Sequence, residues 1–158
     1  MPRTPKPSSL SRSEQTNIVM SGHINGAGRL FGGVLVEWID VAAAVAARRH
    51  SGRDVTTAAI DNLQFKSAAY AGEMVVLISR VTHTGTTSME VRVDTFVESL
   101  DGQRRLINTA YLVMVALDQE GNPTPVPPLL VESEEEQQEW QAAERRRALR
   151  SERRRQAY

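Results

Sequence analysis

The chain has 158 residues, 41% of them hydrophobic, which is enough to bury the core of one globular domain without disulfides. Its 19 Lys and Arg residues balance 19 Asp and Glu residues, so no net charge indicates nucleic acid or an anionic membrane as the partner. Cysteine is absent, which excludes disulfides, thiolate metal sites and a cysteine nucleophile, and suits a reducing, cytoplasmic location.

The N-terminal segment, residues 1–13, contains basic residues but lacks the apolar stretch of a secretory signal. We expect it to be a disordered tail. The main domain is then expected over residues 14–130, and a helical extension over residues 131–158. Residues 14–20 are weakly patterned, and only their position before a glycine-rich loop favours a strand.

A long apolar helix is expected over residues 31–49, which are rich in alanine and apolar around most of the helix circumference. The segment approaches the length of a membrane span. However, it contains the charged residues Glu37 and Asp40, which are costly inside a bilayer, so we interpret it as a buried helix of a soluble protein. Gly52 should end the helix as a left-handed cap.

Four further strands are expected at residues 55–65, 74–81, 89–98 and 106–117. In the third, apolar residues such as Val91 and Val93 alternate with polar residues such as Glu90 and Arg92, which is typical of a sheet with one face in water. The intervening turns are short, so the sheet should be largely antiparallel, with the long helix on its concave face. The sequence therefore predicts an α+β domain.

A second helix is expected near the C-terminus, where Ser133 and Glu136 form the S-x-x-E pattern of a capping box. Its acidic start and arginine-rich end fit the helix dipole. The arginines either contact RNA or a nucleotide phosphate or form a solvated helix end, and the interspersed glutamates favour the solvated end.

Asp40 is a candidate general base, because its neighbours in the sequence, Trp38, Ile39 and Val41, are apolar. Partial burial disfavours the charged form of a carboxylate and makes it more basic. The same pattern also suits an ordinary carboxylate that shares a polar strip with Glu37 and meets solvent or an arginine.

Four glycines lie before and within the first turn of the long helix: Gly26, Gly28, Gly32 and Gly33. They either let a ligand approach backbone N–H groups that have no partner in the helix, or let the helix pack closely on the sheet. Their spacing matches neither G-x-G-x-x-G nor a P-loop. Asn25, in the same loop, is typical of a turn.

Other patterns of catalysis are missing from the sequence. There is no H-E-x-x-H or histidine cluster for a metal and no G-x-S-x-G for a serine nucleophile. His23, His50 and His83 are isolated beside turns, and the residues alone give them no catalytic or metal-binding role.

Four segments in order, residues 25–40, 56–65, 81–91 and 115–129, resemble the hotdog-fold acyl-CoA thioesterases, specifically the small bacterial acyl-CoA hydrolases related to brain acyl-CoA hydrolase. The resemblance implies a five- or six-stranded antiparallel sheet wrapped around one long helix. It also implies hydrolysis of a fatty or short-chain acyl-CoA to the free acid and coenzyme A, with no cofactor beyond the coenzyme A of the substrate and product.

The resemblance also implies roles for individual residues. Asp40 would be the general base or the nucleophile, Asn25 would place the water or the carbonyl, and amides at the helix start would polarise that carbonyl. These amides are those of Gly32, Gly33 and Val34. Residues Phe31, Gly32, Asp61 and Phe65 would line the substrate site, and coenzyme A would contact His83, Thr84, Gly85, Thr86, Thr87 and Ser88.

In this family the asparagine loop of one subunit faces the catalytic aspartate of another, so the resemblance implies a homodimer with shared sites, assembled further into a trimer of dimers. No nucleic acid or membrane partner is expected. The chain departs from the family at His23 and Ile24, where Asp-Thr is common, and at Gly26. These changes remove hydrogen bonds that would hold the loop, and they leave a non-catalytic acyl-CoA-binding regulatory module as the alternative.

Overall fold

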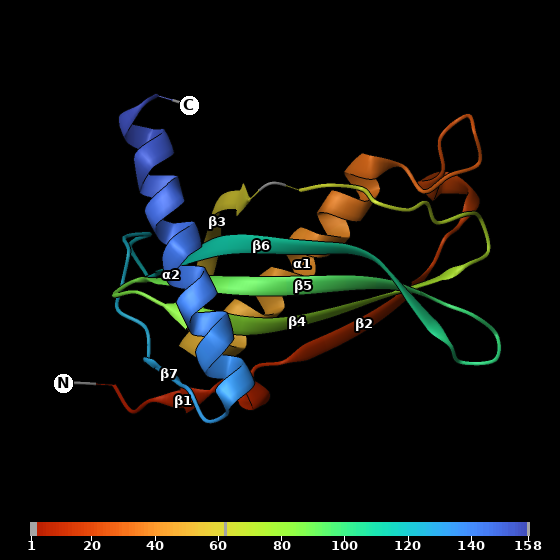
Figure 1. Ribbon diagram of the computed structural model, residues 1–158. Coiled ribbons are helices and arrows are strands. Elements are labelled where there is room, and N and C mark those ends of the chain that lie inside the picture. The colour runs from red at the N-terminus through yellow and green to blue at the C-terminus, as the bar shows by residue number, and fades with distance from the viewer. Residues whose placement is uncertain (1–2, 62, 158) are drawn as a thin grey trace.

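A five-stranded antiparallel sheet curls around one long helix (Figure 1). The computed structural model describes residues 3–61 and 63–157. The sheet has the order β2-β4-β5-β6-β3. Its strands are β2 (Ser13–Ile18), β3 (Asp54–Asp61), β4 (Met74–Thr84), β5 (Ser88–Glu98) and β6 (Arg104–Leu117). This arrangement confirms the expected α+β hotdog fold.

Helix α1 (Gly32–Ser51) lies in the concave face of the sheet and forms the core with it. Ile39, Ala42 and Ala46 of α1 are fully buried, as is Val91 of β5. Small alanine side chains allow the helix to approach the sheet closely, which explains why the composition of this segment is rich in alanine. The helix ends as predicted, with Gly52 in the left-handed conformation at φ 66°.

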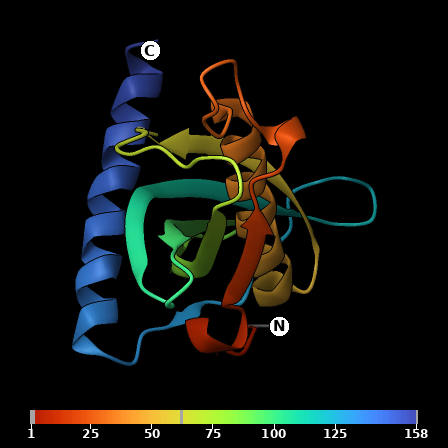
Figure 2. The ribbon, with the colours of Figure 1, turned by 90° about the vertical axis from the view of Figure 1, so that its right-hand side faces the viewer.

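Helix α2 (Glu134–Arg155) covers the opposite, convex face, so the sheet lies between two helices (Figure 2). The predicted cap is present, since Ser133 Oγ accepts a hydrogen bond from the Glu136 N–H at 3.0 Å. The prediction of a face in water is wrong beneath this helix. Glu90, on that face of β5, is only 3% exposed because Arg146 of α2 covers and pairs with it.

The N-terminal segment is also ordered where it is described, so the expected disorder is wrong for residues 3–13. Strand β1 (Lys6–Pro7) pairs in parallel with β7 (Leu129–Leu130), and a 3-10 helix, η1 (Ser8–Leu10), follows. Ser11 is fully buried. The local composition is typical of disorder. It could not reveal the pairing of β1 with β7, because β7 lies more than a hundred residues away in the sequence. Residues 1–2 lie outside the described part of the chain.

Two strand ends differ from the prediction in ways that affect the site. β3 ends at Asp61, so Phe65 lies in an irregular segment, and position 62 lies outside the described residues. β4 continues through His83 and Thr84, which were expected in a turn. Within residues 3–61 and 63–157, no helix combines the length and apolar character needed to cross a membrane.

Candidate active site

Asp40 lies in the middle of α1 at the boundary between the core and the surface. On one side of it in the sequence Ile39 is fully buried, and on the other Val41 is 49% exposed. Its Oδ1 accepts a hydrogen bond from Thr57 Oγ1 on β3 at 2.6 Å. No arginine or lysine of the described residues forms a salt bridge with Asp40, so its carboxylate is held in place but not neutralised.

Thr57 is a site residue that the sequence did not reveal. It is one of two adjacent threonines in β3, and threonine is common in strands for reasons of backbone preference alone. Only the packing of α1 against β3 identifies it. A sequence signal would have required knowledge that position 57 lies opposite position 40.

The loop before α1 is shaped by Asn25. Its side-chain Oδ1 accepts hydrogen bonds from the backbone N–H of Ala27 at 2.9 Å and of Arg29 at 3.2 Å. This is the turn role expected from its residue type. Its side-chain N–H₂ makes no hydrogen bond to any described residue, so the amide can still donate to a ligand.

His23 supplies contacts that hold this loop where the family pattern has Asp-Thr. Its Nδ1 accepts a hydrogen bond from the Met20 N–H at 3.0 Å, and its carbonyl oxygen accepts one from the Phe31 N–H at 2.8 Å. The ring also packs edge-on against Trp38, with 5.1 Å between ring centroids. The His23 side chain therefore fixes the loop through the Met20 N–H and the Trp38 ring.

The start of α1 offers two backbone donors. The N–H of Val34 donates to the Phe31 carbonyl at 3.0 Å, so this amide is already paired. The N–H groups of Gly32 and Gly33 have no such partner within residues 3–61 and 63–157, as is usual in the first turn of a helix. A Cβ at Gly33 would lie 2.8 Å from Cε1 of Phe31, so glycine keeps the Phe31 ring over this turn.

A cleft of about 290 Å³ brings part of the predicted site together, because Asn25, Gly32 and Phe65 all line it. Leu35 adds an apolar wall. Asp40 does not line this cleft. It lies eight residues beyond Gly32, or about 12 Å along the helix axis. Within one chain, the asparagine and the aspartate are therefore not placed together.

Two residues expected to contact coenzyme A, His83 and Thr84, are buried in β4. His83 Nε2 forms a hydrogen bond with Glu144 Oε1 at 2.9 Å, and its ring packs against Trp140 of α2 at 4.1 Å. The contact with His83 lowers the pKa of Glu144. Thr84 Oγ1 accepts a hydrogen bond from the Leu129 N–H at 3.0 Å. These two residues hold α2 and β7 to the sheet.

The turn that follows is more accessible. Thr86 is exposed, while Gly85 and Ser88 are half-buried and close the turn through a hydrogen bond from the Gly85 N–H to the Ser88 carbonyl at 2.9 Å. Thr87 uses its carbonyl oxygen to accept from Ala116. The guanidinium of Arg147 lies against Gly85, where a Cβ would come within 3.1 Å of Nη1.

Asp61 is also placed differently from the other expected substrate-lining residues. Its Oδ2 pairs with Arg150 Nη1 at 2.5 Å, and both side chains are more than four-fifths buried. Asp61 therefore ties β3 to α2 and does not line the cleft that contains Asn25 and Phe65. Phe31, which is 55% exposed at the N-cap of α1, does not line that cleft either.

Residues 27–101 match the family described as the thioesterase superfamily. The chain is 40% identical over 125 residues to an uncharacterized acyl-CoA thioester hydrolase, YkhA, of Bacillus subtilis, covering 78% of this chain and 73% of the relative. It is 32% identical to the cytosolic acyl coenzyme A thioester hydrolase of Homo sapiens, which is longer, and this match spans 36% of the human protein. Matches to other mammalian relatives likewise span 21% to 35% of their length.

Solved structures share the fold over nearly the whole chain. An apo-hexameric acyl-CoA thioesterase aligns with a TM-score of 0.90 and 40% identity, over 95% of this chain and 97% of that one. An acyl-CoA hydrolase from Staphylococcus aureus, in complex with butyryl coenzyme A and coenzyme A, aligns with a TM-score of 0.90 and 32% identity, over 96% and 93%. Further structures of that enzyme carry alanine in place of an aspartate, an asparagine or a threonine. The family match, the identity across most of a bacterial relative and the shared fold together establish that the chain belongs to the thioesterase superfamily.

Proposed function

We propose that the protein hydrolyses the thioester of a fatty or short-chain acyl-CoA to the free carboxylic acid and coenzyme A. The observation that carries the proposal is the Asp40 carboxylate in the middle of the largely apolar helix α1, held at 2.6 Å by Thr57 and free of any salt bridge to a described residue. The names of the relatives and the coenzyme A complexes of the Staphylococcus aureus enzyme support the substrate class.

In this proposal Asp40 acts as general base or as nucleophile. As a base it takes a proton from water, whose oxygen attacks the thioester carbonyl carbon. The C–S bond then breaks, and the sulfur of coenzyme A leaves with the electron pair and receives the proton. The side-chain amide of Asn25 positions the carbonyl, and the N–H groups of Gly32 and Gly33 stabilise the developing oxyanion.

The complete site would be formed by two copies of the chain. The loop of Asn25 from one copy would face Asp40 of the other, because a single chain keeps the two residues apart. Strand β3 lies at the edge of the sheet, with Thr57 and its neighbours exposed, and it offers unpaired backbone groups to a second copy. The similarity to a hexameric thioesterase supports assembly into a trimer of such dimers.

The test is release of free thiol from a panel of acyl-CoA substrates of increasing chain length. Asp40→Asn preserves the shape of the side chain and removes the base, so it should lower kcat roughly 10²- to 10⁴-fold. The matched control is Glu37→Gln, one turn away on α1 at an exposed position. Coenzyme A binding by calorimetry without turnover of any substrate would instead identify a non-catalytic binding module.

A further inference from the structure

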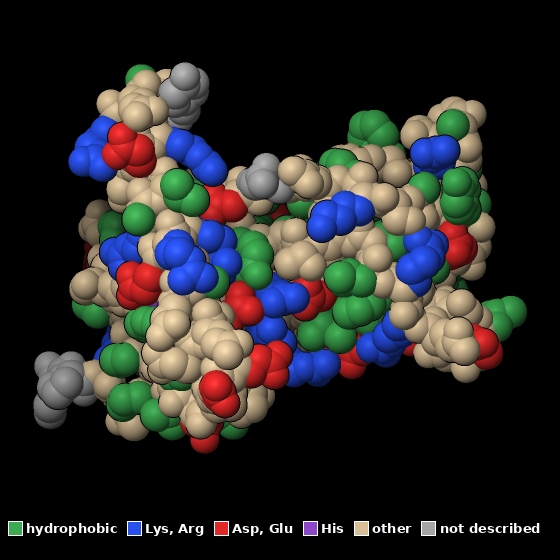
Figure 3. All heavy atoms as spheres, in the orientation of Figure 1, with side chains coloured by type: hydrophobic (Ala, Val, Ile, Leu, Met, Phe, Trp, Pro, Cys, Tyr) green, Lys and Arg blue, Asp and Glu red, His purple; other side chains and the backbone are tan. Residues whose placement is uncertain are grey.

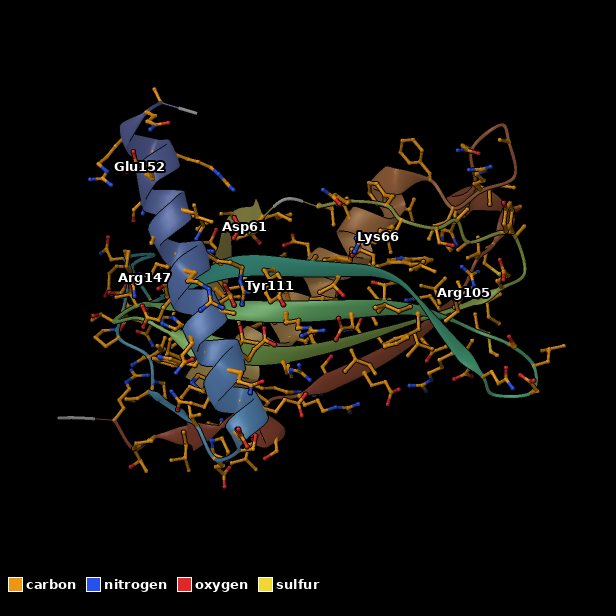
Figure 4. All side chains as sticks on the ribbon, in the orientation of Figure 1. Asp61, Lys66, Arg105, Tyr111, Arg147 and Glu152 are labelled. Carbon is orange, nitrogen blue, oxygen red and sulfur yellow. The ribbon has the colours of Figure 1, made fainter. Side chains whose placement is uncertain are left out.

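A second cleft, of about 390 Å³, lies on the convex side of the sheet between α2 and β6. Helix α2 contributes Arg146, Leu149 and Arg153, and β6 contributes Thr109 and Tyr111. Lys66, from the segment after β3, lines it from across the cleft. Figure 4 shows Lys66 on the segment that crosses above β6, with Asp61 and Tyr111 between it and α2.

This cleft is positively charged, although the chain as a whole has no net charge. Its lining contains one carboxylate, Asp61, which already pairs with Arg150 at 2.5 Å. Lys66 and Arg153 form no salt bridge with any described residue. Figure 3 shows lysine and arginine side chains gathered along α2 and across this face. Two unpaired cations therefore line the same cleft.

The rest of the lining is fixed and partly apolar. Arg146 is held by Glu90, with two hydrogen bonds of 2.8 and 3.0 Å, and its guanidinium lies 3.6 Å from the centroid of the Tyr111 ring. Leu149 is 56% exposed and offers an apolar surface beside the cations. The cleft thus combines a rigid floor, an apolar wall and two cationic side chains that form no salt bridge with the described residues.

We infer that this cleft binds the phosphate groups of a nucleotide bisphosphate or diphosphate. A guanidinium and an ammonium group are the side chains that bind phosphate most strongly, and the apolar wall suits a base. The volume lies within the range of about 300–1,000 Å³ found for small-molecule sites. The bound nucleotide is either the nucleotide end of the acyl-CoA substrate, which rests on the proposed function, or a free nucleotide.

Lys66 favours the substrate as the source. It lines both the basic cleft and the cleft that contains Asn25. The two clefts therefore meet at Lys66, and one elongated ligand could place its phosphates beside Arg153 and extend past Lys66 towards Asn25. This assignment places coenzyme A phosphates at residues other than the turn at 85–88.

Calorimetry with adenosine 3′,5′-bisphosphate and with ADP tests the inference. The double variant Lys66→Gln/Arg153→Gln should weaken binding roughly 100-fold, about tenfold for each lost charge-assisted contact. The matched control Arg53→Gln/Arg145→Gln removes the same charge from exposed positions outside the cleft and should leave the affinity unchanged. Failure of both nucleotides to bind the wild type, or equal binding to the double variant, would overturn the inference.

Steady-state kinetics separates the two sources. If the nucleotide end of the substrate occupies the cleft, the double variant raises KM for acyl-CoA but not for the matching acyl-pantetheine, which lacks the nucleotide. If a free nucleotide is the ligand, the wild type and the double variant have the same KM for acyl-CoA, while the double variant still loses affinity for the nucleotide. Hydrolysis that depends on Asp40 but occurs without any nucleotide binding would overturn this inference alone and leave the proposed function intact.

Discussion

The hydrogen bond from Thr57 to Asp40 determines how the carboxylate is presented. A carboxylate on a helix surface can adopt several rotamers, and a donor at 2.6 Å selects one of them. Because Thr57 belongs to β3 and Asp40 to α1, the packing of helix on sheet sets the orientation of the proposed base. Thr57 is thus a positioning residue in this scheme.

We predict that Thr57→Val lowers kcat for acyl-CoA hydrolysis roughly 10- to 100-fold, because it keeps the shape of the side chain and removes one hydrogen bond to a charged group. Thr57→Ser keeps the hydroxyl and should retain most of the rate. The measurement is thiol release at saturating substrate. A valine variant as fast as the wild type would show that Thr57 does not position the carboxylate.

Sequence reasoning identified Asp40 because a charged residue inside an apolar helix stands out at that position. It did not identify Thr57, and the residues alone presented His50 and His83 as isolated histidines beside turns, although both are buried. Burial of these residues depends on segments that are distant in the sequence: Pro127 for His50, and α2 for His83. No local pattern contains that information.

At the scale of elements, His50 links the C-terminal end of α1 to the segment before β7. Its Nε2 lies 2.8 Å from the Pro127 carbonyl, and its Nδ1 is buried without a hydrogen-bond partner among the described residues. The neutral ring that donates from Nε2 fits this environment. A second proton would place an unpaired donor in the core.

Burial lowers the pKa of His50 below its ordinary value of 6.5, with the nearby Lys6 contributing to the shift and the Pro127 hydrogen bond opposing it. The unfolded chain therefore binds this proton more readily than the folded chain. The stability that His50 contributes is present above pH 6.5 and is lost as the pH falls through the lowered value.

We therefore predict that the melting temperature falls on acidification below pH 6.5, and that His50→Gln reduces this fall while keeping an N–H donor for Pro127. Differential scanning calorimetry between pH 5 and 8 measures both curves. Parallel curves for the variant and the wild type would mean that other groups cause the acid destabilisation.

Ion pairs between arginines of helix α2 and carboxylates of the sheet help to hold the helix in place. Glu90 has a side chain only 2% exposed and accepts hydrogen bonds from Arg146 and, at 2.6 Å, from Thr82 Oγ1. The alternating charges of β5 indicated a face in water, because a strand pattern cannot distinguish water from a charged helix. The complementary arginines of α2 were visible in the sequence, but their pairing with Glu90 was not.

We predict that Arg146→Met destabilises the protein by roughly 3–5 kcal/mol, because it leaves the buried Glu90 carboxylate without its main partner. The double variant Glu90→Leu/Arg146→Met removes both charges and should recover most of the stability. Urea denaturation followed by circular dichroism gives the free energies of unfolding. If Arg146→Met is as stable as the wild type, the ion pair between Glu90 and Arg146 does not hold α2 to the sheet.

At the scale of the whole molecule, the proposed catalytic residues do not line one cleft within a single chain. Asn25 and Gly32 share one cleft, while Asp40 lies two helical turns away beside the exposed edge strand. The fold itself was predictable from periodicity and turns, because those signals are local. The proposed pairing of two chains comes from the family resemblance, because sequence periodicity describes only the elements of one chain.

Complementation tests the shared site directly. Asn25→Ala and Asp40→Asn should each be inactive alone, but a mixed dimer contains one site with both native residues and one with neither. Random mixing makes half of the dimers mixed, so co-expressed variants should regain about a quarter of wild-type activity. Activity no greater than that of the separate variants, in samples whose subunit exchange is verified by mass spectrometry, would place Asn25 and Asp40 in independent or single-chain sites.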